Sequence, residues 1–307
     1  MSVEYAIIVK NKTRLEALIE RFNTKAQAKF YIERSGGDFQ EYIVEHEIFC
    51  AAFAQVQQRL SKIIKNKVVD RSFLPNYLFN EKNVIIVVGQ DGLVANTAKY
   101  SKGVPIVAVN PDPKRYDGVL LPFNKYNFIA AVERVIAGQY HYQMMRFAEA
   151  KLNDGQRLLA FNDLFIGAAS HVSARYKISY NGKIEEHSSS GLLVSTKAGA
   201  TGWLSSVFNM AYGVASMFED VPEPRQPELE DNDLLFAVRE PFKSLRTQTQ
   251  LSIGKVNDSH SLVIESLMPS NGVIFSDGIE TDFLKFNSGV IATIGLAEEQ
   301  AKLVLRK

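Results

Sequence analysis

The chain has few of several residue types, and these scarcities limit its possible functions. It contains one cysteine, Cys50, so no intrachain disulfide can form, and a reducing compartment such as the cytoplasm is expected. Cys50 lies in an apolar segment and is expected to be a buried small hydrophobe. The formal net charge of +1 gives no reason to expect nucleic acid or an anionic membrane as a partner. No apolar run approaches the roughly 18 residues of a membrane span.

The composition is that of a globular protein, with 46% apolar and 22% charged residues over 307 positions. This length predicts about two domains. Strands and helices alternate up to about residue 150, which predicts a doubly wound α/β domain over residues 1–150. Strands dominate afterwards, so residues 151–307 are expected to form a β-rich domain. In this second part, residues 247–253 are predicted to be a strand, and residues 188–203 a strand that leads into a loop of small residues.

One stretch organises the first domain. A short run of apolar, mostly β-branched residues ends at Gly89, which predicts a strand buried on both faces of a parallel sheet. The sequence Gly89-Gln90-Asp91-Gly92 follows, and its two glycines allow a sharp turn and a close approach of the backbone to a ligand. A helix is expected next, with Asn96 or Thr97 near its start.

A strand, a glycine turn and a helix N-terminus together form an anion site with an acid beside it. Phosphoryl transfer to a hydroxyl needs this combination, because amides and a cation hold the phosphates while a carboxylate takes the proton. The alternative is an ordinary strand-to-helix turn with a surface aspartate. The tetrapeptide by itself does not decide between the two, because short glycine motifs often occur by chance.

Two further segments are candidates for a site. The strand over residues 104–109 ends in Asn110-Pro111-Asp112-Pro113, where two prolines fix an irregular loop. Ligands of open α/β sheets bind at such strand ends. The single tryptophan, Trp203, follows a loop of small hydroxyl and glycine residues and offers a face on which a base could stack. A core tryptophan is the alternative.

Several separated motifs resemble one family, the NAD kinases, and more closely their mitochondrial-type branch. The matching segments are Gly89-Gln90-Asp91-Gly92, residues 109–115, Asn162-Asp163, Ser189-Ser190-Gly191, Ala198-Gly199 with Trp203, Arg239-Glu240-Pro241 and Asp277-Gly278. They occur in the family's order, so the match is more specific than any single motif.

The resemblance implies an NAD kinase/diacylglycerol kinase-like fold and transfer of the γ-phosphoryl group of ATP to the 2′-hydroxyl of the adenosine ribose of NAD, with Mg²⁺. It implies that Asp91 is the general base and that no residue of the chain is a dedicated metal ligand. The positions that it implies for substrate binding are Gly89, Gln90, Gly92, Asn110, Asp112, Asn162, Asp163, Ser190, Thr196, Gly199, Thr201 and Trp203. By the same analogy the protein is expected to be a homodimer.

Two alternatives stay open. One is a kinase of the same wider superfamily that phosphorylates another hydroxyl, such as that of a sugar or a lipid headgroup. The other is a non-catalytic sensor that binds NAD without turnover. Asp91 discriminates between them, because a sensor has no need of a base and a kinase fails without one.

Overall fold

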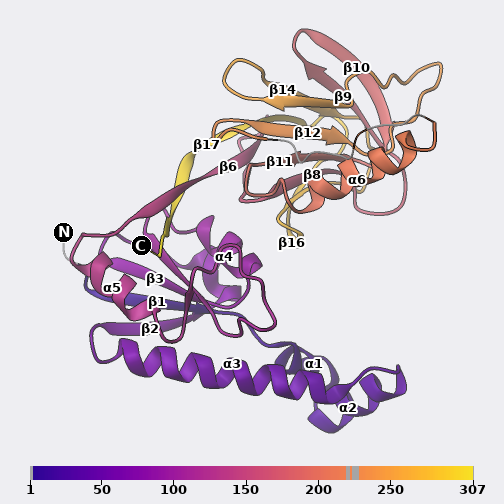
Figure 1. Ribbon diagram of the computed structural model, residues 1–307. Coiled ribbons are helices and arrows are strands. Elements are labelled where there is room, and N and C mark those ends of the chain that lie inside the picture. The colour runs from indigo at the N-terminus through magenta and orange to yellow at the C-terminus, as the bar shows by residue number, and fades with distance from the viewer. Residues whose placement is uncertain (1–2, 219–221, 223–227, 307) are drawn as a thin grey trace. The chain divides into compact units, whose positions relative to one another are not determined.

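The computed structural model describes residues 3–218, 222 and 228–306, and the chain divides into two compact units. Unit 1 comprises Met1–Met144 with Ala301–Lys307, and unit 2 comprises Met145–Gln300. The chain leaves unit 1 along β6 (Tyr142–Leu152) and returns to it along β17 (Ile291–Val304) (Figure 1). The predicted functional division at residue 150 stays a prediction.

Unit 1 is built on a parallel sheet with the strand order β17-β4-β3-β1-β2. Its strands are β1 (Tyr5–Lys10), β2 (Lys65–Asp70), β3 (Asn83–Val88), β4 (Pro105–Asn110) and the end of β17, and the short β5 (Phe123–Asn124) pairs with the end of β4. Every residue of β3 is buried, as expected for a strand covered on both faces.

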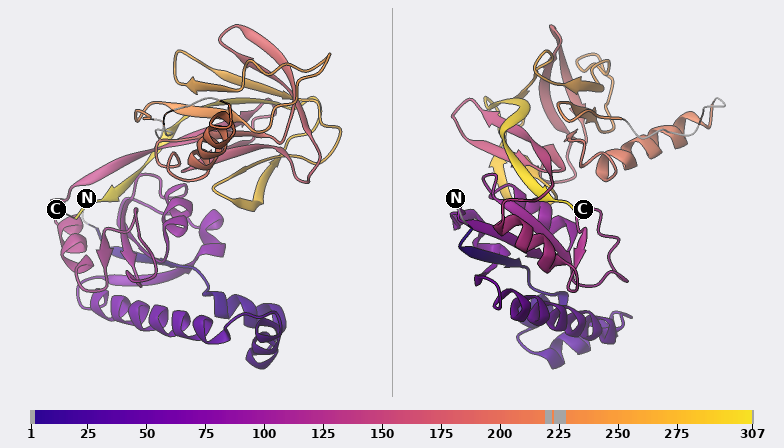
Figure 2. Two further views of the ribbon diagram at one scale, coloured as in Figure 1. Left: turned by 45° about the vertical axis from the view of Figure 1, so that its right-hand side comes forward. Right: turned by 60° about the vertical axis from the view of Figure 1, so that its left-hand side comes forward.

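Helices cover the sheet of unit 1. They are α1 (Arg14–Phe22), α2 (Lys25–Arg34), α3 (Phe39–Leu60), α4 (Asp91–Ala98), α5 (Phe128–Ile136) and a short 3₁₀ helix, η1 (Arg71–Asn76). Apolar residues of α3 and α5 share one buried cluster with alternate residues of β1, β3 and β4. The 22-residue helix α3 runs along this face in all views, and α4 lies on the other side of the strands (Figure 1 and Figure 2). The predicted α/β fold of the amino-terminal part is confirmed.

Unit 2 is a β-sandwich, and its described residues include one helix. One layer has the order β10-β9-β14-β17, and the other has the order β13-β12-β11-β8-β15-β16. The strands are β7 (Arg157–Ala160), β8 (Asp163–Ala168), β9 (Ala174–Tyr180), β10 (Lys183–Ser189), β11 (Leu192–Ser195), β12 (Leu234–Val238), β13 (Ile253–Val256), β14 (Leu262–Ser266), β15 (Gly272–Ser276) and β16 (Ile279–Lys285). The predicted β-rich carboxyl-terminal part is confirmed.

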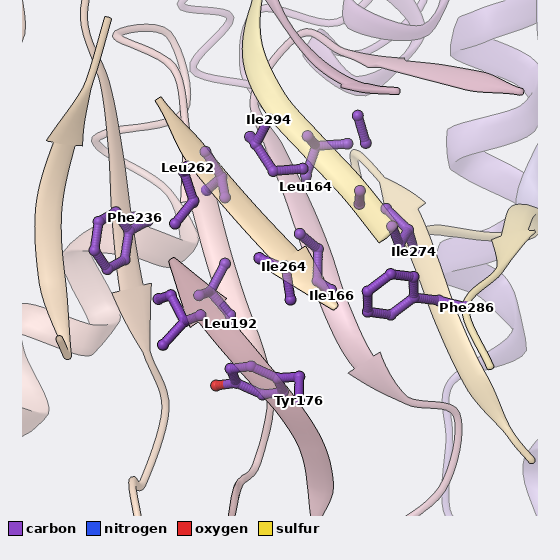
Figure 3. Close-up of a cluster of buried hydrophobic side chains, with 14 of the residues drawn as sticks. Leu164, Ile166, Tyr176, Leu192, Phe236, Leu262, Ile264, Ile274, Phe286 and Ile294 are labelled. Atoms are coloured by element: carbon purple, nitrogen blue, oxygen red, sulfur yellow. The ribbon is translucent and has the colours of Figure 1, made fainter. Parts of the chain in front are cut away.

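The core of unit 2 lies between its two layers (Figure 3). Leu164, Leu192 and Phe236 of one layer meet Tyr176 and Ile264 of the other, and all five are fully buried. The helix α6 (Trp203–Ala215) packs Leu204 and Phe208 on the outer face of β11 and β12, where the side chains of opposite parity point. The architecture therefore places residues 195–203 between a core strand and a helix.

Four local expectations were wrong. The helix after the glycine turn begins at Asp91, five residues before the predicted Asn96. The segment predicted to be a strand over residues 247–253 is irregular except for its last residue, which begins β13. The chain from Trp203 onward is the helix α6, which the sequence reading missed. Cys50 is exposed on α3, where its Sγ lies 3.6 Å from Nε2 of His46. None of the described helices is both long and apolar enough to cross a membrane.

Candidate active site

The predicted turn connects β3 to α4. The surroundings of its two glycines differ. A Cβ on Gly89 would lie 2.8 Å from Cδ2 of Leu93 in the following helix. A Cβ on Gly92 would meet nothing within 4 Å. A side chain at position 89 would therefore have to displace the side chain of Leu93, whereas at position 92 the space beside the backbone is open to a ligand.

Asp91 is the first residue of α4, and the main chain holds its carboxylate. The backbone N–H of Leu120 donates to Oδ1 of Asp91 at 2.7 Å. Within the described part of the chain, this carboxylate has no other hydrogen-bond or ion-pair partner. One oxygen is thus fixed and the other can accept a proton. The N-cap residue, Gln90, makes no side-chain hydrogen bond to the helix, so the first-turn N–H groups of α4 can serve a ligand.

A cavity of about 300 Å³ lies beside this turn. Its walls come from the segments that follow β1, β2, β3 and β4, together with α3. The lining residues are Asn11, Lys12, Thr13, Arg14, Glu45, Phe49, Arg71, Val88, Gly89, Gln90, Gly92, Leu93, Pro111 and Tyr116. The connections from β1 and β3 lead to opposite edges of the sheet, so this is the switch point at which doubly wound folds bind ligands. Asp91 borders the turn but is not among the lining residues of this cavity.

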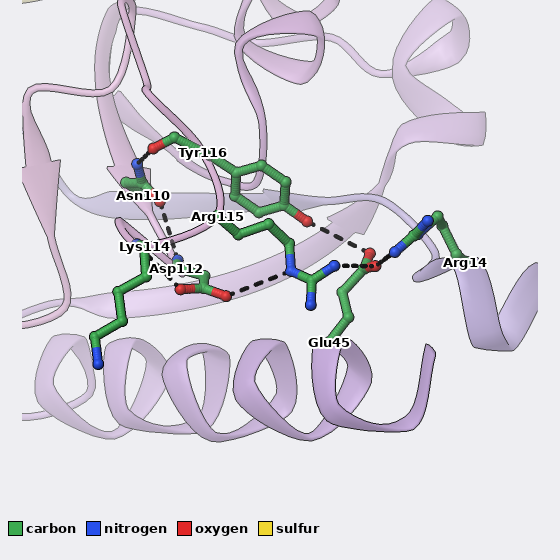
Figure 4. Close-up of polar contacts among 7 residues, drawn as sticks. All are labelled: Arg14, Glu45, Asn110, Asp112, Lys114, Arg115 and Tyr116. Carbon is green, nitrogen blue, oxygen red and sulfur yellow. Dashed lines mark hydrogen bonds and ion pairs between the residues drawn. The ribbon is translucent and has the colours of Figure 1, made fainter. Parts of the chain in front are cut away.

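Glu45 on α3 is the centre of a polar network at the cavity (Figure 4). Its carboxylate is buried and accepts from Nε of Arg14 at 2.5 Å, from Nη1 of Arg115 at 3.5 Å and from the hydroxyl of Tyr116 at 3.4 Å. Burial raises the pKa of Tyr116, so its hydroxyl stays protonated and donates. Glu45 thereby joins the start of α1 to the loop that follows β4. No sequence signal pointed to Glu45, because its partners come from distant segments.

Asn110 and Asp112, both predicted to bind substrate, shape the loop after β4. Nδ2 of Asn110 donates to the carbonyl of Tyr116 at 2.9 Å, and its Oδ1 accepts from the N–H of Asp112 at 3.0 Å. Oδ1 of Asp112 accepts from the N–H of Lys114 at 3.2 Å, and its Oδ2 lies 3.7 Å from Nε of Arg115. These contacts explain why the loop needs both residues. Their direct contact with substrate stays a prediction.

In unit 2, Asn162 and Asp163 are held at the start of β8 by a residue from the turn between β15 and β16. Oδ1 of Asp277 accepts from the N–H of Asn162 at 2.6 Å, and Oδ2 accepts from the N–H of Phe161 at 3.1 Å. Burial, and then the nearby carboxylate of Asp277, raise the pKa of Asp163 to about 7. At neutral pH a large fraction of Asp163 is therefore protonated and can donate a hydrogen bond. The sequence marked Asp277 as part of a segment that resembles the family, and it gave no sign of this long-range role.

Thr196 and Gly199 close around the same backbone. Oγ1 of Thr196 donates to the carbonyl of Phe161 at 2.6 Å, and its N–H donates to the carbonyl of Asn162 at 2.8 Å. A Cβ on Gly199 would lie 2.2 Å from the carbonyl oxygen of Asn162. The structure therefore brings Asn162, Asp163, Thr196 and Gly199 into one cluster. Their direct contact with substrate stays a prediction.

Trp203 belongs to an aromatic stack that also lines a cavity. Its ring is nearly parallel to that of Phe165, at 8° and 5.6 Å between centroids, and the guanidinium of Arg239 lies 5.4 Å from its centroid. A cavity of about 570 Å³ includes Ser190, Trp203 and Arg239 in its lining. The indole thus packs against the protein and also borders open space, and its stacking on a base stays a prediction. Thr201 is exposed in the turn before α6.

The sequence-predicted residues form separate groups within the units. In unit 1, Gly89, Gln90 and Gly92 share the cavity beside Asp91. In unit 2, Asn162, Asp163, Thr196 and Gly199 form one cluster, while Ser190 and Trp203 line the larger cavity. The described residues contain no group of three or more His, Cys, Asp and Glu side chains that could hold a metal ion.

Solved structures of dinucleotide kinases share this fold. Yeast NADH kinase complexed with NADH matches all of this chain (100%) and 84% of its own chain, with a TM-score of 0.61 and 13% sequence identity. The NAD kinase of Archaeoglobus fulgidus in complex with ATP matches 98% of this chain and 92% of its own, with a TM-score of 0.56 and 15% identity. The chain therefore has the fold of these kinases.

Sequence comparison points to kinases of the same kind. No family model matches the chain. The NAD kinase of Heliobacterium modesticaldum is 30% identical over 129 residues, which are 39% of this chain and 44% of that protein. The bifunctional NADP phosphatase/NAD kinase of Methanococcus maripaludis is 25% identical over 174 residues, which are 52% of this chain and 28% of that protein. The chain spans less than half the length of these curated relatives. The matches confirm the resemblance recognised in the motifs: the chain is related to the NAD kinases. The mitochondrial-type branch stays a prediction.

Proposed function

We propose that this protein is an NAD kinase, which transfers the γ-phosphoryl group of ATP to the 2′-hydroxyl of the adenosine ribose of NAD to form NADP. Three observations support the proposal: the related NAD kinases, the shared fold, and the turn that presents Asp91 beside a cavity at the switch point. The single observation that carries it is the geometry of Asp91. Its carboxylate is oriented by the N–H of Leu120 at the N-terminus of α4, next to a backbone that leaves room for phosphates.

The proposed chemistry uses this carboxylate as a general base. The 2′-hydroxyl gives its proton to the unbonded oxygen of Asp91 as the ribose oxygen forms a bond to the γ-phosphorus. The bond from that phosphorus to the bridging oxygen breaks, and ADP leaves with the electron pair. Most of the catalytic effect in such reactions comes from positioning and charge stabilisation, to which the N–H groups of α4 would contribute.

Mg²⁺ belongs to the same proposal. In nucleotide-dependent transferases this ion is usually held by one or two carboxylates and the substrate phosphates, while several waters remain bound. A site with open space for phosphates and no cluster of carboxylates among the described residues fits an ion that enters with ATP and is held mainly by phosphates and water. When bound, Mg²⁺ would neutralise developing charge on the phosphates.

The residues of unit 2 would bind the acceptor. A partly protonated Asp163 can donate a hydrogen bond to a ribose oxygen or accept one from a ribose hydroxyl, and Asn162 can do both. The aromatic wall formed by Trp203 suits a flat nitrogenous base. A homodimer and a cytoplasmic location, predicted by analogy and from the single cysteine, are parts of the same proposal.

The test is direct. The purified protein is incubated with ATP, Mg²⁺ and NAD, and NADP is detected with a dehydrogenase that accepts only NADP. Formation of NADP that depends on both ATP and protein supports the proposal. Binding of NAD with no consumption of ATP would indicate a sensor. Consumption of ATP with a sugar, without product from NAD or NADH, would indicate a kinase for another acceptor.

A further inference from the structure

The cavity beside the glycine turn is lined by three cationic side chains, and their surroundings differ. Lys12 and Arg14 follow β1, and Arg71 is the first residue of η1, directly after β2. Nζ of Lys12 lies 2.8 Å from Oε2 of Glu20, and Arg14 is paired with Glu45. These two charges are therefore already balanced by carboxylates of the protein.

Arg71 has no such balance in the described part of the chain. Its Nε donates to Oδ1 of Asn96 at 3.3 Å, and no carboxylate of the described residues forms an ion pair with it. Asn96 is buried in α4, with 6% of its surface exposed. The neutral amide orients the guanidinium by one N–H and leaves the four N–H groups of its terminal nitrogens for another acceptor.

A half-buried guanidinium at a cavity wall that forms no ion pair among the described residues is suited to an anionic ligand. The planar fork of arginine binds phosphate oxygens in a bidentate way, with short, charge-assisted hydrogen bonds. Gly92 lines the same cavity, and the space beside its backbone is open. Arg71 and the glycine turn thus contribute to one cavity, and Asn96 links Arg71 to the helix that begins at that turn.

The size of the cavity favours the phosphates of the donor. Its volume of about 300 Å³ is at the lower end of the range of small-molecule pockets, roughly 300 to 1,000 Å³. It can take a chain of phosphates but not an entire dinucleotide. We propose that Arg71, oriented by Asn96, binds the phosphates of the nucleoside triphosphate donor. This inference rests on the proposed function for the identity of the reaction, but not for the anion binding itself.

The experiment measures binding of the full-length protein by calorimetry. Wild type, Arg71→Ala and Arg71→Lys are titrated with ATP, inorganic tripolyphosphate, adenosine and NAD. We expect Arg71→Ala to lower the affinity for ATP and for tripolyphosphate by about 10- to 100-fold, the scale of a charge-assisted hydrogen-bonded contact. Adenosine and NAD should bind as to wild type. Arg71→Lys keeps the charge but loses the planar fork of the guanidinium. Its affinity for ATP and tripolyphosphate should lie between those of wild type and Arg71→Ala.

A matched control removes a cation from the same unit but outside the cavity. Arg21 on α1 stacks on Phe22 and does not line the cavity, so Arg21→Ala should bind ATP and tripolyphosphate like wild type. Thermal unfolding and circular dichroism establish that each variant is folded. If Arg71→Ala is unfolded, the comparison rests on Arg71→Lys, which retains the charge. This variant should still bind tripolyphosphate measurably more weakly than wild type.

The outcomes separate this inference from the proposed function. Unchanged affinity of a folded Arg71 variant for tripolyphosphate would overturn the inference, even if the enzyme makes NADP. A loss confined to NAD would overturn it as well, because the anion bound would then be the dinucleotide's. Weakened ATP and tripolyphosphate binding in a protein that makes no NADP would support Arg71 and reject the NAD kinase proposal. Where NADP is made, the KM for ATP should rise while the KM for NAD stays the same.

Discussion

Gly199 lies so close to Asn162 that the loop between β11 and α6 leaves no room for a side chain there. A Cβ at position 199 would be 2.2 Å from the carbonyl oxygen of Asn162 and 2.6 Å from its carbonyl carbon. Because both obstructing atoms are backbone, a rotamer change cannot relieve the overlap. The geometry of this loop therefore depends directly on one glycine.

We predict that Gly199→Ala destabilises unit 2 by about 1 to 3 kcal/mol, the usual cost of overpacking a well-packed site. It should also lower the affinity for NAD, because the backbone of Asn162 must move. The matched control is Gly213→Ala on α6, where a Cβ meets nothing within 4 Å. That change should stabilise the helix by roughly 0.5 to 1 kcal/mol. Chemical denaturation of both variants tests the pair, and equal stability of the two would contradict the steric argument.

Asp91→Asn is predicted to lower kcat by ~10²-fold or more, the scale of a lost general base. The amide oxygen can still accept the N–H of Leu120, which Asp91 binds at 2.7 Å, so the start of α4 should keep its geometry. Affinities for ATP and NAD should change little. Steady-state kinetics and calorimetry on the same preparation measure both. A variant that turns over like wild type would show that another group takes the proton.

Gly92→Ala is predicted to separate stability from activity. A Cβ at position 92 meets no protein atom within 4 Å, and alanine is the better helix former, so the free energy of unfolding should stay the same or rise by up to about 1 kcal/mol. The methyl group would occupy space at the cavity wall, so ATP binding should weaken. Thermal melts and ATP titrations test this. Loss of stability with normal ATP binding would show that the glycine serves the fold instead.

Asp163 is predicted to give unit 2 a characteristic dependence on pH. Its pKa is raised from an ordinary value of 3.8 to about 7, so the folded state binds this proton more tightly than the unfolded state. The resulting stability is fully present below pH 3.8 and is lost as the pH rises through about 7. Asp163→Asn should therefore be more stable than wild type at pH 8, by up to about 4 kcal/mol, and similar to it at pH 4.

The control for this prediction is Asp154→Asn. The backbone and side-chain amides of Gln156 lower the pKa of exposed Asp154, so its contribution to stability is lost as the pH falls. Because that loss falls below about pH 3.8, Asp154→Asn should differ from wild type by a nearly constant amount in denaturation experiments between pH 4 and pH 8, whereas Asp163→Asn should gain stability relative to wild type as the pH rises. A constant difference between Asp163→Asn and wild type across this range would reject the raised pKa.

The sequence predicted features that depend on neighbouring residues. The strand before Gly89 and the turn at Asp91 were recognised because apolar runs and glycines act locally. The start of α4 was placed too late, because a glycine at position 92 is typical of a turn and is unfavourable within a helix. The helix from Trp203 was missed for a similar reason, since the glycines and threonine before it resemble a continuing loop.

Other features depend on residues that are distant in the sequence, and no local pattern predicts them. Asp277 accepts a hydrogen bond from the N–H of Asn162, which is 115 positions away in the sequence. Glu45 accepts one from Arg115, which is 70 positions away. Arg71 joins the cavity only because β2 ends beside β1 in the sheet. The expectation that Cys50 is buried was wrong. Its neighbours in the sequence are apolar, but the sequence did not show which face of α3 points to the core.

The return of the chain through β17 has a consequence for anyone who shortens this protein. Lys302 and Leu303 pair with Pro105 and Ile106, so the final residues close the edge of the amino-terminal sheet. A version that stops at residue 300 would expose the first part of β4 as an unpaired edge, a common starting point for aggregation. A shortened protein that keeps the amino-terminal half should therefore carry these last residues, fused through a short linker.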